Sequence, residues 1–279
     1  MKKRELLIIT GITGFIGSHI VSKLDHLEKK FHIVGLSSKN IYEIKKSRFY
    51  KISKLSLKNL AEESKEITLI HLATFYSLNE DDREKIISAN EDFGYSIFKS
   101  FGLKKVKKII YTNSVFTFSK DEIIRNSTYV RTKKNFSKYL EEYSKQNSSS
   151  FSEIFLGNTF GVNDFRKKLI PNIISSTKQK EPLVLKDPEK FINLVPVDII
   201  ADVIIKEIPK EANKYSILSK FDYKILSIYE FCKNEVQKYE NKDILKKDNN
   251  EKAFLPANIE ILEINTNLEK ELKLILSKK

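Results

Sequence analysis

The chain has 279 residues, of which 41% are hydrophobic and 31% charged, and its formal net charge is +13. This composition excludes a disordered chain, and because no apolar run approaches the roughly 20 residues that span a bilayer, we expect no membrane insertion. The single cysteine, Cys232, excludes an internal disulfide, and the four histidines show no metal-ligand spacing. We therefore expect a cytoplasmic protein without a metal.

The first ten residues, MKKRELLIIT, begin like a secretion signal because basic residues precede an apolar run. Thr10 and Gly11 interrupt that run, and no cleavage site of small residues follows. We therefore interpret the run as the first strand of a folded domain.

The excess of positive charge has two interpretations. Lysines are spread along the whole chain, which is typical of solvated faces. A basic surface also attracts anions, either nucleic acid or a substrate that carries a diphosphate. No recognition motif supports nucleic acid, so we expect no such partner. The densest cluster, LKKVKKIIY at 103–111, is interpreted as a solvated approach to a buried strand.

In the first half of the chain, apolar runs alternate with amphipathic stretches. The runs predict strands at 5–10, 31–36, 67–72, 106–113 and 151–157, with a weaker one at 48–53. The stretches between them predict helices at 15–29, 56–64, 81–101 and 126–146. This alternation predicts an α/β fold with a doubly wound, Rossmann-like parallel sheet that is covered on both faces.

After about residue 158 the alternation loosens. Helix-like stretches at 167–179, 198–207 and 225–239 mix with short apolar pieces at 183–185, 191–195 and 215–218. We expect a first domain at 1–158 and a smaller C-terminal lobe at 159–279, some of whose segments return to the first domain. The lobe is expected at the carboxyl ends of the strands, where open α/β sheets bind ligands.

A glycine turn, TGITGFIGSH at 10–19, joins the first predicted strand to the first predicted helix. Gly11 would allow the tight exit from the strand, and Gly14 would let a pyrophosphate approach the backbone. Gly17 would let the helix pack close to the sheet. The spacing is G-x-x-G-x-x-G, and its place after the first strand indicates that the first domain binds NAD(P).

The end of the second predicted strand bears on the choice of cofactor. A carboxylate there would bind the adenosine ribose of NAD, but this chain has Ser37, Ser38 and Lys39. Hydroxyls beside a cation suit a 2′-phosphate, so NADP is predicted, with NAD as the alternative. A plain surface turn would have a similar sequence.

Ser114, Tyr129 and Lys133 are the candidate catalytic residues. A nearby cation favours the phenolate and so lowers a tyrosine pKa, and a lysine four residues later on a helix shares the tyrosine's face. Ser114 ends the predicted strand 106–113 and would polarise the reacting oxygen.

The Y-x-x-x-K spacing alone carries little information in so lysine-rich a chain. It also occurs at Tyr42/Lys46, Tyr50/Lys54, Tyr95/Lys99 and Tyr229/Lys233. Placement favours Tyr129, because it follows a buried strand that ends in hydroxyl side chains. The alternative is that Tyr129 is an ordinary half-buried helix residue and Ser114 a strand-end cap.

Taken together, these motifs resemble those of the extended short-chain dehydrogenase/reductase family, the branch that acts on nucleotide-linked sugars. The matching segments are TGITGFIGSH at 10–19, HLAT at 71–74, Asn90, IIYTNSVFTF at 109–118, YVRTK at 129–133, LGNTFGVNDFRKKLIPNII at 156–174 and VPVDIIADVI at 195–204. The form NTFGVNDFRKKLIP most resembles the 4-ketoreductases that complete CDP-linked 3,6-dideoxyhexoses such as abequose and paratose.

The resemblance implies a set of site residues. The cofactor would be held by Gly11, Thr13, Gly14, Phe15, Ile16, Gly17, Leu72, Ala73, Thr74, Tyr129 and Lys133. The substrate would be held by Thr74, Asn113, Ser114, Asn158, Arg166, Leu169 and Asn193. The family also implies a nucleotide-diphosphate sugar as substrate, a role in deoxysugar and O-antigen biosynthesis, and a homodimer formed through the helices at 81–101 and around Tyr129.

Several departures from the family's pattern narrow the prediction. Val115 and Phe116 follow Ser114 where the 4,6-dehydratases have an Asp-Glu pair, so elimination chemistry lacks its acid and base. Ile192 stands where many members have an arginine for the substrate diphosphate, and Ile199 replaces the usual second Asp. The loop from Ser114 to Tyr129 is short and lacks the common Tyr-Gly.

The leading prediction is reduction of a 4-keto nucleotide sugar with hydride from NAD(P)H and a proton from Tyr129. A nucleotide-sugar 4-epimerase would use the same residues but retain its NAD. A cofactor-sensing protein without catalysis is the third alternative, although such proteins commonly lose the tyrosine or lysine that this chain keeps.

Overall fold

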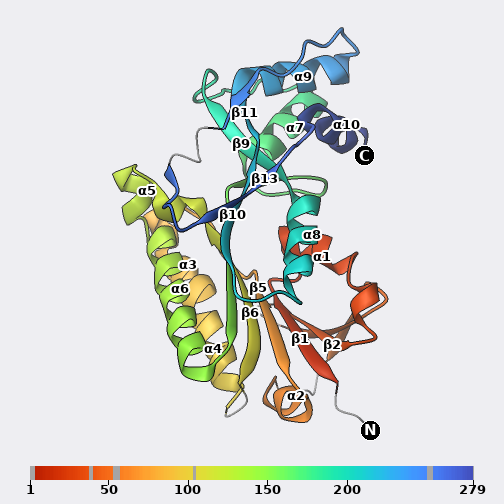
Figure 1. Cartoon of the computed structure of the whole chain (residues 1–279). Helices are drawn as coiled ribbons and strands as arrows, with labels where there is room; N and C mark the ends of the chain where they lie inside the picture. The colour runs from red at the N-terminus through yellow and green to blue at the C-terminus, as the bar shows by residue number, and fades with distance from the viewer. Residues whose placement is uncertain (1–3, 38–39, 53–56, 103–104, 250–253, 279) are drawn as a thin grey trace. The chain divides into compact units, whose positions relative to one another are not determined.

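The computed structural model describes residues 4–37, 40–52, 57–102, 105–249 and 254–278. The chain divides into two compact units (Figure 1), of which the first comprises Met1–Phe155 and Ala201–Tyr215 and the second comprises Leu156–Ile200 and Ser216–Lys279. Within the described residues, every helix is too short or too polar to cross a membrane.

The first unit supplies the consecutive strands β7-β6-β5-β1-β2-β3-β4 of the larger sheet, in which β10 (Lys214–Ser219) follows β7 and β13 (Glu260–Ile264) follows β10. Its strands are β1 (Glu5–Thr10), β2 (Phe31–Leu36), β3 (Ile41–Lys45), β4 (Arg48–Ile52), β5 (Ile67–His71), β6 (Val106–Ser114) and β7 (Ser150–Leu156). β1 pairs in parallel with β2 and β5, and β5 pairs in parallel with β6. The chain thus extends the sheet on both sides of β1, which confirms the predicted doubly wound fold.

Helices cover both faces of this sheet. They are α1 (Phe15–Val21), α2 (Leu57–Glu63), α3 (Arg83–Ile87), α4 (Phe93–Ser100), α5 (Glu122–Asn126), α6 (Thr128–Asn147) and the later part of α8 (Val197–Glu207). Figure 1 shows α3, α4 and α6 on one side of the sheet and α1 and α8 on the other. An ion pair of 2.7 Å between Lys23 and Asp202 joins the segment after α1 to α8.

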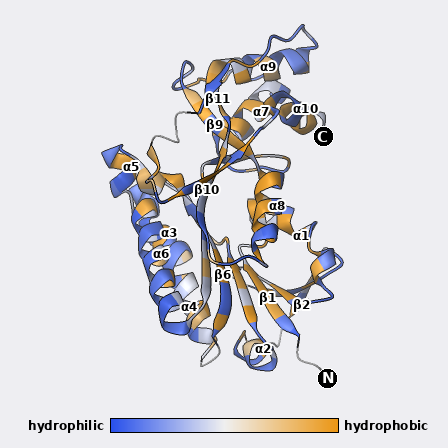
Figure 2. Cartoon of the chain, in the orientation of Figure 1, coloured by the Kyte–Doolittle hydropathy of each residue, from blue (hydrophilic) through white to orange (hydrophobic). Residues whose placement is uncertain are grey.

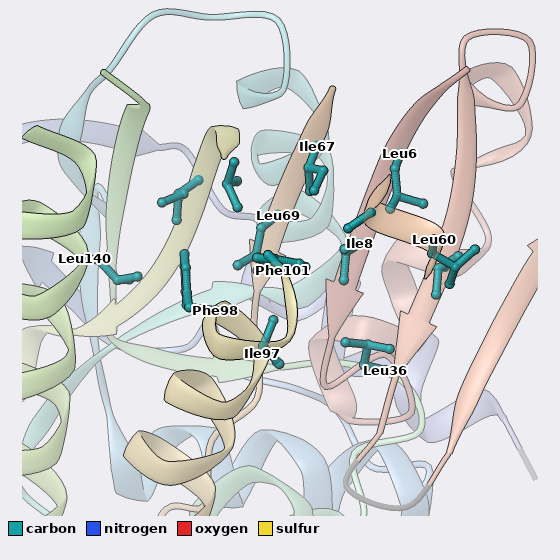
Figure 3. Packing of buried hydrophobic residues seen from close by; sticks show 14 of the residues in the cluster. Leu6, Ile8, Leu36, Leu60, Ile67, Leu69, Ile97, Phe98, Phe101 and Leu140 are labelled. Carbon is teal, nitrogen blue, oxygen red and sulfur yellow. The ribbon is translucent and has the colours of Figure 1, made fainter. Parts of the chain in front are cut away.

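The core of the first unit lies between the sheet and the helices α2, α4 and α6 (Figure 3). Side chains alternate along a strand, so Leu6 and Ile8 of β1 point to this face together. They meet Leu60 of α2, Phe98 of α4 and Leu140 of α6 in one cluster of buried residues. The ribbon of α6 is coloured hydrophilic along much of its length (Figure 2), as expected for a long helix with one buried face.

Two predicted helices differ from the structure, and one strand of the first sheet was not predicted. The helix expected at 15–29 ends at Val21, where the Ser22 hydroxyl donates to the carbonyl of His19, and only a 3-10 turn, η1 (Asp25–Leu27), follows. The helix expected at 81–101 is interrupted by a π-helical turn, η3 (Ser88–Asp92), between α3 and α4. Strand β3 was not predicted, and it forms an antiparallel hairpin with β4.

Lys108 is an exception to the interpretation of residues 103–111 as a solvated approach to a buried strand, because Lys105 and Lys107 are exposed as expected and residues 103–104 lie outside the described residues. The Lys108 side chain is buried, and its Nζ donates to Ser152 Oγ at 2.7 Å and to the carbonyl oxygens of Lys210 and Glu211 at 3.0 Å each. Glu207 Oε1 lies 3.8 Å away. A buried ammonium is costly unless its donors have partners. The partners of Lys108 link β6 to β7 and to the segment after α8.

The second unit contains a smaller sheet with the order β12-β11-β9-β8. Its elements are β8 (Asn158–Phe160), α7 (Leu169–Gln179), β9 (Phe191–Pro196), β11 (Phe221–Lys224), α9 (Ile225–Gln237), β12 (Lys246–Asp248), β13 (Glu260–Ile264) and α10 (Leu268–Ser277), while β10 (Lys214–Ser219) begins in the first unit and ends in the second. Phe160, Ile173, Phe231 and Leu272 belong to its core, against which Leu183 and Leu185 pack from an irregular segment.

Candidate active site

The glycine turn after β1 is tight and partly exposed. Gly11 has a φ of +65°, in the left-handed region that favours glycine, and its N–H donates to the carbonyl of Leu36 on β2. The N–H of Gly14 donates to the carbonyl of Gly11 at 2.9 Å, and Gly14 is the N-cap residue of α1. Thr13 and Gly14 are exposed, while Phe15 and Ile16 are half-buried on the first turn of α1.

Gly17 is where α1 comes closest to this turn. A Cβ at Gly17 would lie 2.3 Å from the carbonyl oxygen of Gly11 and 2.6 Å from Ile12 Cα, both backbone atoms. These short distances support the prediction that the lack of a side chain at Gly17 lets the helix pack closely.

Substitution of Gly17 by alanine is expected to lower the free energy of unfolding by about 2–3 kcal/mol, because the backbone must move to admit the methyl group. Gly102→Ala is the matched control. Gly102 has a φ of +58°, but no atom of the described residues lies within 4 Å of the place that a Cβ would occupy, so only about 1 kcal/mol of backbone strain is expected. Guanidinium unfolding of the two variants measures the difference, and equal losses would contradict the steric argument.

The segment that follows β5 lies directly beside the glycine turn. Thr10 Oγ1, at the end of β1, accepts hydrogen bonds from the N–H groups of Leu72 and Ala73, each at 3.1 Å. A Cβ at Gly11 would lie 2.8 Å from the nitrogen of Ala73. The structure thus brings together the predicted cofactor residues of the turn and of the segment Leu72–Thr74, with Thr74 exposed next to them.

Tyr129 is buried near the start of α6, two residues after Ser127. The Ser127 hydroxyl accepts from the N–H of Val130 and so caps the helix. The Tyr129 side chain forms hydrogen bonds with the side chains of Ser114, from the end of β6, and Thr74, from the segment after β5. Three hydroxyl groups from three separate segments therefore meet at one point.

The protonation state of Tyr129 differs from the prediction. Burial raises its pKa to about 12, although hydrogen bonding with Ser114 and Thr74 acts in the opposite direction. The expectation that Lys133 brings this pKa toward neutrality is wrong for the structure, because Lys133 Nζ donates to the carbonyl of Thr112 at 2.7 Å and lies over the ring of Tyr111. Tyr129 is consequently a protonated phenol at neutral pH.

Lys133 is itself strongly affected by its dry surroundings. Burial lowers the pKa of its ammonium to about 7, and the charge of Glu153 opposes this shift. His71 lies in the same region, where burial followed by the charge of Lys133 lowers its pKa to about 3 and keeps the ring neutral. Near pH 7 the fraction of Lys133 that is protonated therefore depends strongly on the charges and the burial around it.

Asn90 positions the Thr74 segment. Its Oδ1 accepts from Thr74 Oγ1 at 3.0 Å and from the N–H of Phe75 at 2.7 Å, while its Nδ2 donates to Thr132 Oγ1 at 3.2 Å. Asn90 stands in the π-helical turn η3, a type of irregularity that often marks functional sites. The sequence marked Asn90 only as part of a resemblance, since its partners are distant along the chain.

Aromatic side chains surround the tyrosine. The ring of Tyr76 meets Tyr129 edge to face with the centroids 4.9 Å apart, and it lies 6.1 Å from the ring of Phe116. Tyr76 was not predicted as a site residue. Its place two residues after HLAT (71–74) is the sequence feature that could have indicated it.

The predicted NADP residues are described only in part. Ser37 follows β2 and closes a short loop, in which its N–H donates to the carbonyl of Asn40 at 3.0 Å and its hydroxyl accepts from the N–H of Asn40 at 3.1 Å. Ser38 and Lys39 lie outside the described residues.

Two predicted substrate residues have their side chains engaged inside the protein. Asn113 Nδ2 donates to Glu153 Oε1 at 2.6 Å, and its Oδ1 accepts from the N–H of Ser114. Asn193 Nδ2 donates to the carbonyl of Ser219 and to Asp222, and both asparagines are buried. These contacts disagree with a direct role in binding a substrate, because they use the amide groups for internal support.

The other predicted substrate residues belong to the second unit. Asn158 Nδ2 donates to the carbonyl of Asn193 at 3.3 Å. Arg166 is partly exposed, and it is held by Asp164 Oδ1 at 2.6 Å and by the carbonyl of Thr159 at 2.8 Å. Leu169 begins α7 and packs against the unit's core.

A protonated tyrosine held by two hydroxyl groups, at the carboxyl ends of parallel strands and with a glycine turn on the first of them, is the arrangement of a Rossmann-like enzyme that uses a nicotinamide cofactor. Thr13 and Gly14 are exposed residues at the start of α1, where the phosphates of such a cofactor would fit. The chain belongs to the NAD-dependent epimerase/dehydratase family, whose family model matches residues 7–210.

Curated relatives of the chain include two proteins described as CDP-abequose synthase. The protein from Yersinia pseudotuberculosis is 26% identical over 227 residues, which cover 80% of this chain and 78% of the relative. The protein from Salmonella typhimurium is 25% identical over 229 residues, which cover 76% of this chain and 74% of the relative.

Among solved structures, the chain is similar to UDP-glucose 4-epimerase from Thermotoga maritima, which was solved with UDP-glucose. The TM-score is 0.74 at 17% identity, with 97% of each chain covered. At this identity the likeness shows the fold.

Proposed function

We propose that the protein reduces the ketone of a 4-keto nucleotide sugar to an alcohol. The observation that carries this proposal is Tyr129, a protonated phenol at neutral pH that shares hydrogen bonds with Ser114 and Thr74. A ketone that receives a hydride needs a proton on its oxygen, and a buried phenol can donate one. A bound NADPH would supply the hydride.

Each residue of the cluster then has a defined task. Ser114 donates a hydrogen bond to the carbonyl oxygen of the substrate, which polarises the C=O bond. As the hydride reaches the carbon, the electron pair of the C=O bond moves to the oxygen, and Tyr129 gives its proton to that oxygen. The phenolate that remains is stabilised by its hydrogen bonds with Ser114 and Thr74. Lys133, one helical turn away, would hold the cofactor with its ammonium.

The relatives and the sequence support a particular substrate and cofactor. The similarity to two CDP-abequose synthases supports a CDP-linked 4-keto-3,6-dideoxyhexose as substrate and a place in O-antigen synthesis. The absence of an acidic residue at 37–40 supports NADPH. Asn158, Arg166 and Leu169 remain the proposed contacts to the nucleotide sugar, and a homodimer in the cytoplasm remains part of the proposal.

The test is NADPH consumption. Purified protein is mixed with NADPH and a CDP-linked 4-keto-3,6-dideoxyhexose, and one equivalent of NADPH absorbance is expected to disappear for each equivalent of sugar. Mass spectrometry of the product should show a gain of two hydrogens. Interconversion of UDP-glucose and UDP-galactose with tightly retained NAD, and without loss of absorbance, would identify an epimerase and overturn the proposal.

A further inference from the structure

A buried carboxylate lies behind the catalytic cluster, and the proposed chemistry does not use it. Glu153 stands in the middle of β7 and is 1% exposed. Its Oε1 accepts from Asn113 Nδ2 at 2.6 Å and from Ser137 Oγ at 2.5 Å. Its Oε2 forms an ion pair of 2.7 Å with Lys214 Nζ. A buried charge costs several kcal/mol unless it is paired, so its presence calls for an explanation.

The two hydrogen bonds to Oε1 join the elements that carry the catalytic residues. Asn113 is on β6 between Thr112, whose carbonyl holds Lys133 Nζ, and Ser114. Ser137 is on α6, one turn after Lys133. A single oxygen atom therefore connects the strand that bears Ser114 to the helix that bears Tyr129 and Lys133.

The titratable groups around Lys133 come from several elements, and Glu153 is the charged one among those named here. His71 on β5 is neutral, and the phenols of Tyr111 on β6 and Tyr129 on α6 are protonated because burial raises the pKa of both. Glu153 on β7 supplies the negative charge that supports the Lys133 ammonium.

Lys214, which pairs with Glu153 Oε2, has a second carboxylate partner. Lys214 is 36% exposed and also pairs with Glu141 Oε1 of α6 at 2.8 Å. Glu153 therefore keeps a net influence on Lys133.

We propose that Glu153 is a positioning residue that holds β6 and α6 together and serves as the counter-charge that keeps Lys133 protonated. This inference rests on the role given to Lys133 in the proposed function. Its test uses the protein without cofactor or substrate, so the outcome does not depend on which sugar is reduced.

The experiment follows the titration of Lys133 by nuclear magnetic resonance in protein labelled with ¹³C at lysine Cε. The Lys133 signal is assigned by its loss in Lys133→Arg. Glu153→Gln keeps the two hydrogen bonds to Oε1 but removes the charge, and the midpoint is expected to fall by about half a unit or more. Glu153→Asp keeps the charge and should restore a midpoint close to that of the unchanged protein.

Glu141→Gln is the matched control, because it removes a carboxylate that pairs with the same lysine, Lys214, but makes no hydrogen bond to Asn113 or Ser137. Its Lys133 midpoint should not move. If Glu153→Gln fails to fold because Lys214 loses a buried partner, Glu153→Gln with Lys214→Gln removes both charges, and the same fall is expected. A midpoint that is unchanged in the folded charge-removing variant, or that falls equally in Glu153→Asp, would overturn the proposal.

Discussion

Replacement of Tyr129 by phenylalanine is expected to lower kcat for ketone reduction by about 10²–10⁴-fold, the usual contribution of a general acid. The ring would still fill its buried position against Tyr76, so the fold should remain intact. Ser114 and Thr74 would keep their places but lose the proton donor between them. The rate of NADPH oxidation measures the loss, and circular dichroism checks the fold.

The control for this variant is Tyr95→Phe. Tyr95 also precedes a lysine by four residues, but its ring packs against Phe136 and Tyr139 in the helical layer rather than near Ser114. Its activity should match that of the unchanged protein. Full activity of Tyr129→Phe would show that another group delivers the proton.

Replacement of Lys133 by methionine is expected to remove activity and yet stabilise the protein. Burial holds the pKa of Lys133 at about 7, below its ordinary value of 10.5. Below pH 7 the native state therefore carries the full cost of a buried ammonium. Between about pH 7 and 10.5 the unfolded chain binds a proton at Lys133 that the native state lacks. The free energy of unfolding that Lys133 contributes therefore rises as the pH increases through this range.

Methionine fills the same space without that cost, so the free energy of unfolding at pH 6 should rise by about 1–3 kcal/mol. The gain should be smaller at about pH 9, where the native lysine is neutral. Guanidinium unfolding at both pH values tests this, and the neighbouring exposed Lys134→Met should stay within about 0.5 kcal/mol. Loss of stability in Lys133→Met at pH 6 would refute the argument.

The sequence predicted those features that depend on short segments. Strands β1, β2, β5, β6 and β7 follow from apolar runs of five to nine residues, and the glycine turn follows from its place after the first of them. Tyr129 is distinguished from four other Y-x-x-x-K matches because it follows a strand ending in hydroxyl groups. Its meeting with Ser114 follows from the parallel order of strands.

What the sequence did not predict depends on contacts between distant segments. Asn90 and Glu153 act through partners 15 to 61 residues away, and Lys108 through carbonyl groups about a hundred residues away. The high pKa of Tyr129 depends on how completely neighbouring elements exclude water. A charged residue inside the apolar run SEIFL was the one local sign of Glu153.

The return of Ala201–Tyr215 to the first unit affects how this protein can be made. Residues 1–155 contain both Lys108 and Glu153, whereas Glu207 and Lys214 are translated only after part of a second folding unit has been synthesised. A nascent chain that stops at residue 155 would bury two charges without their partners. The first unit is thus completed late in translation, and an expression fragment must extend through Tyr215 to include every residue of that unit.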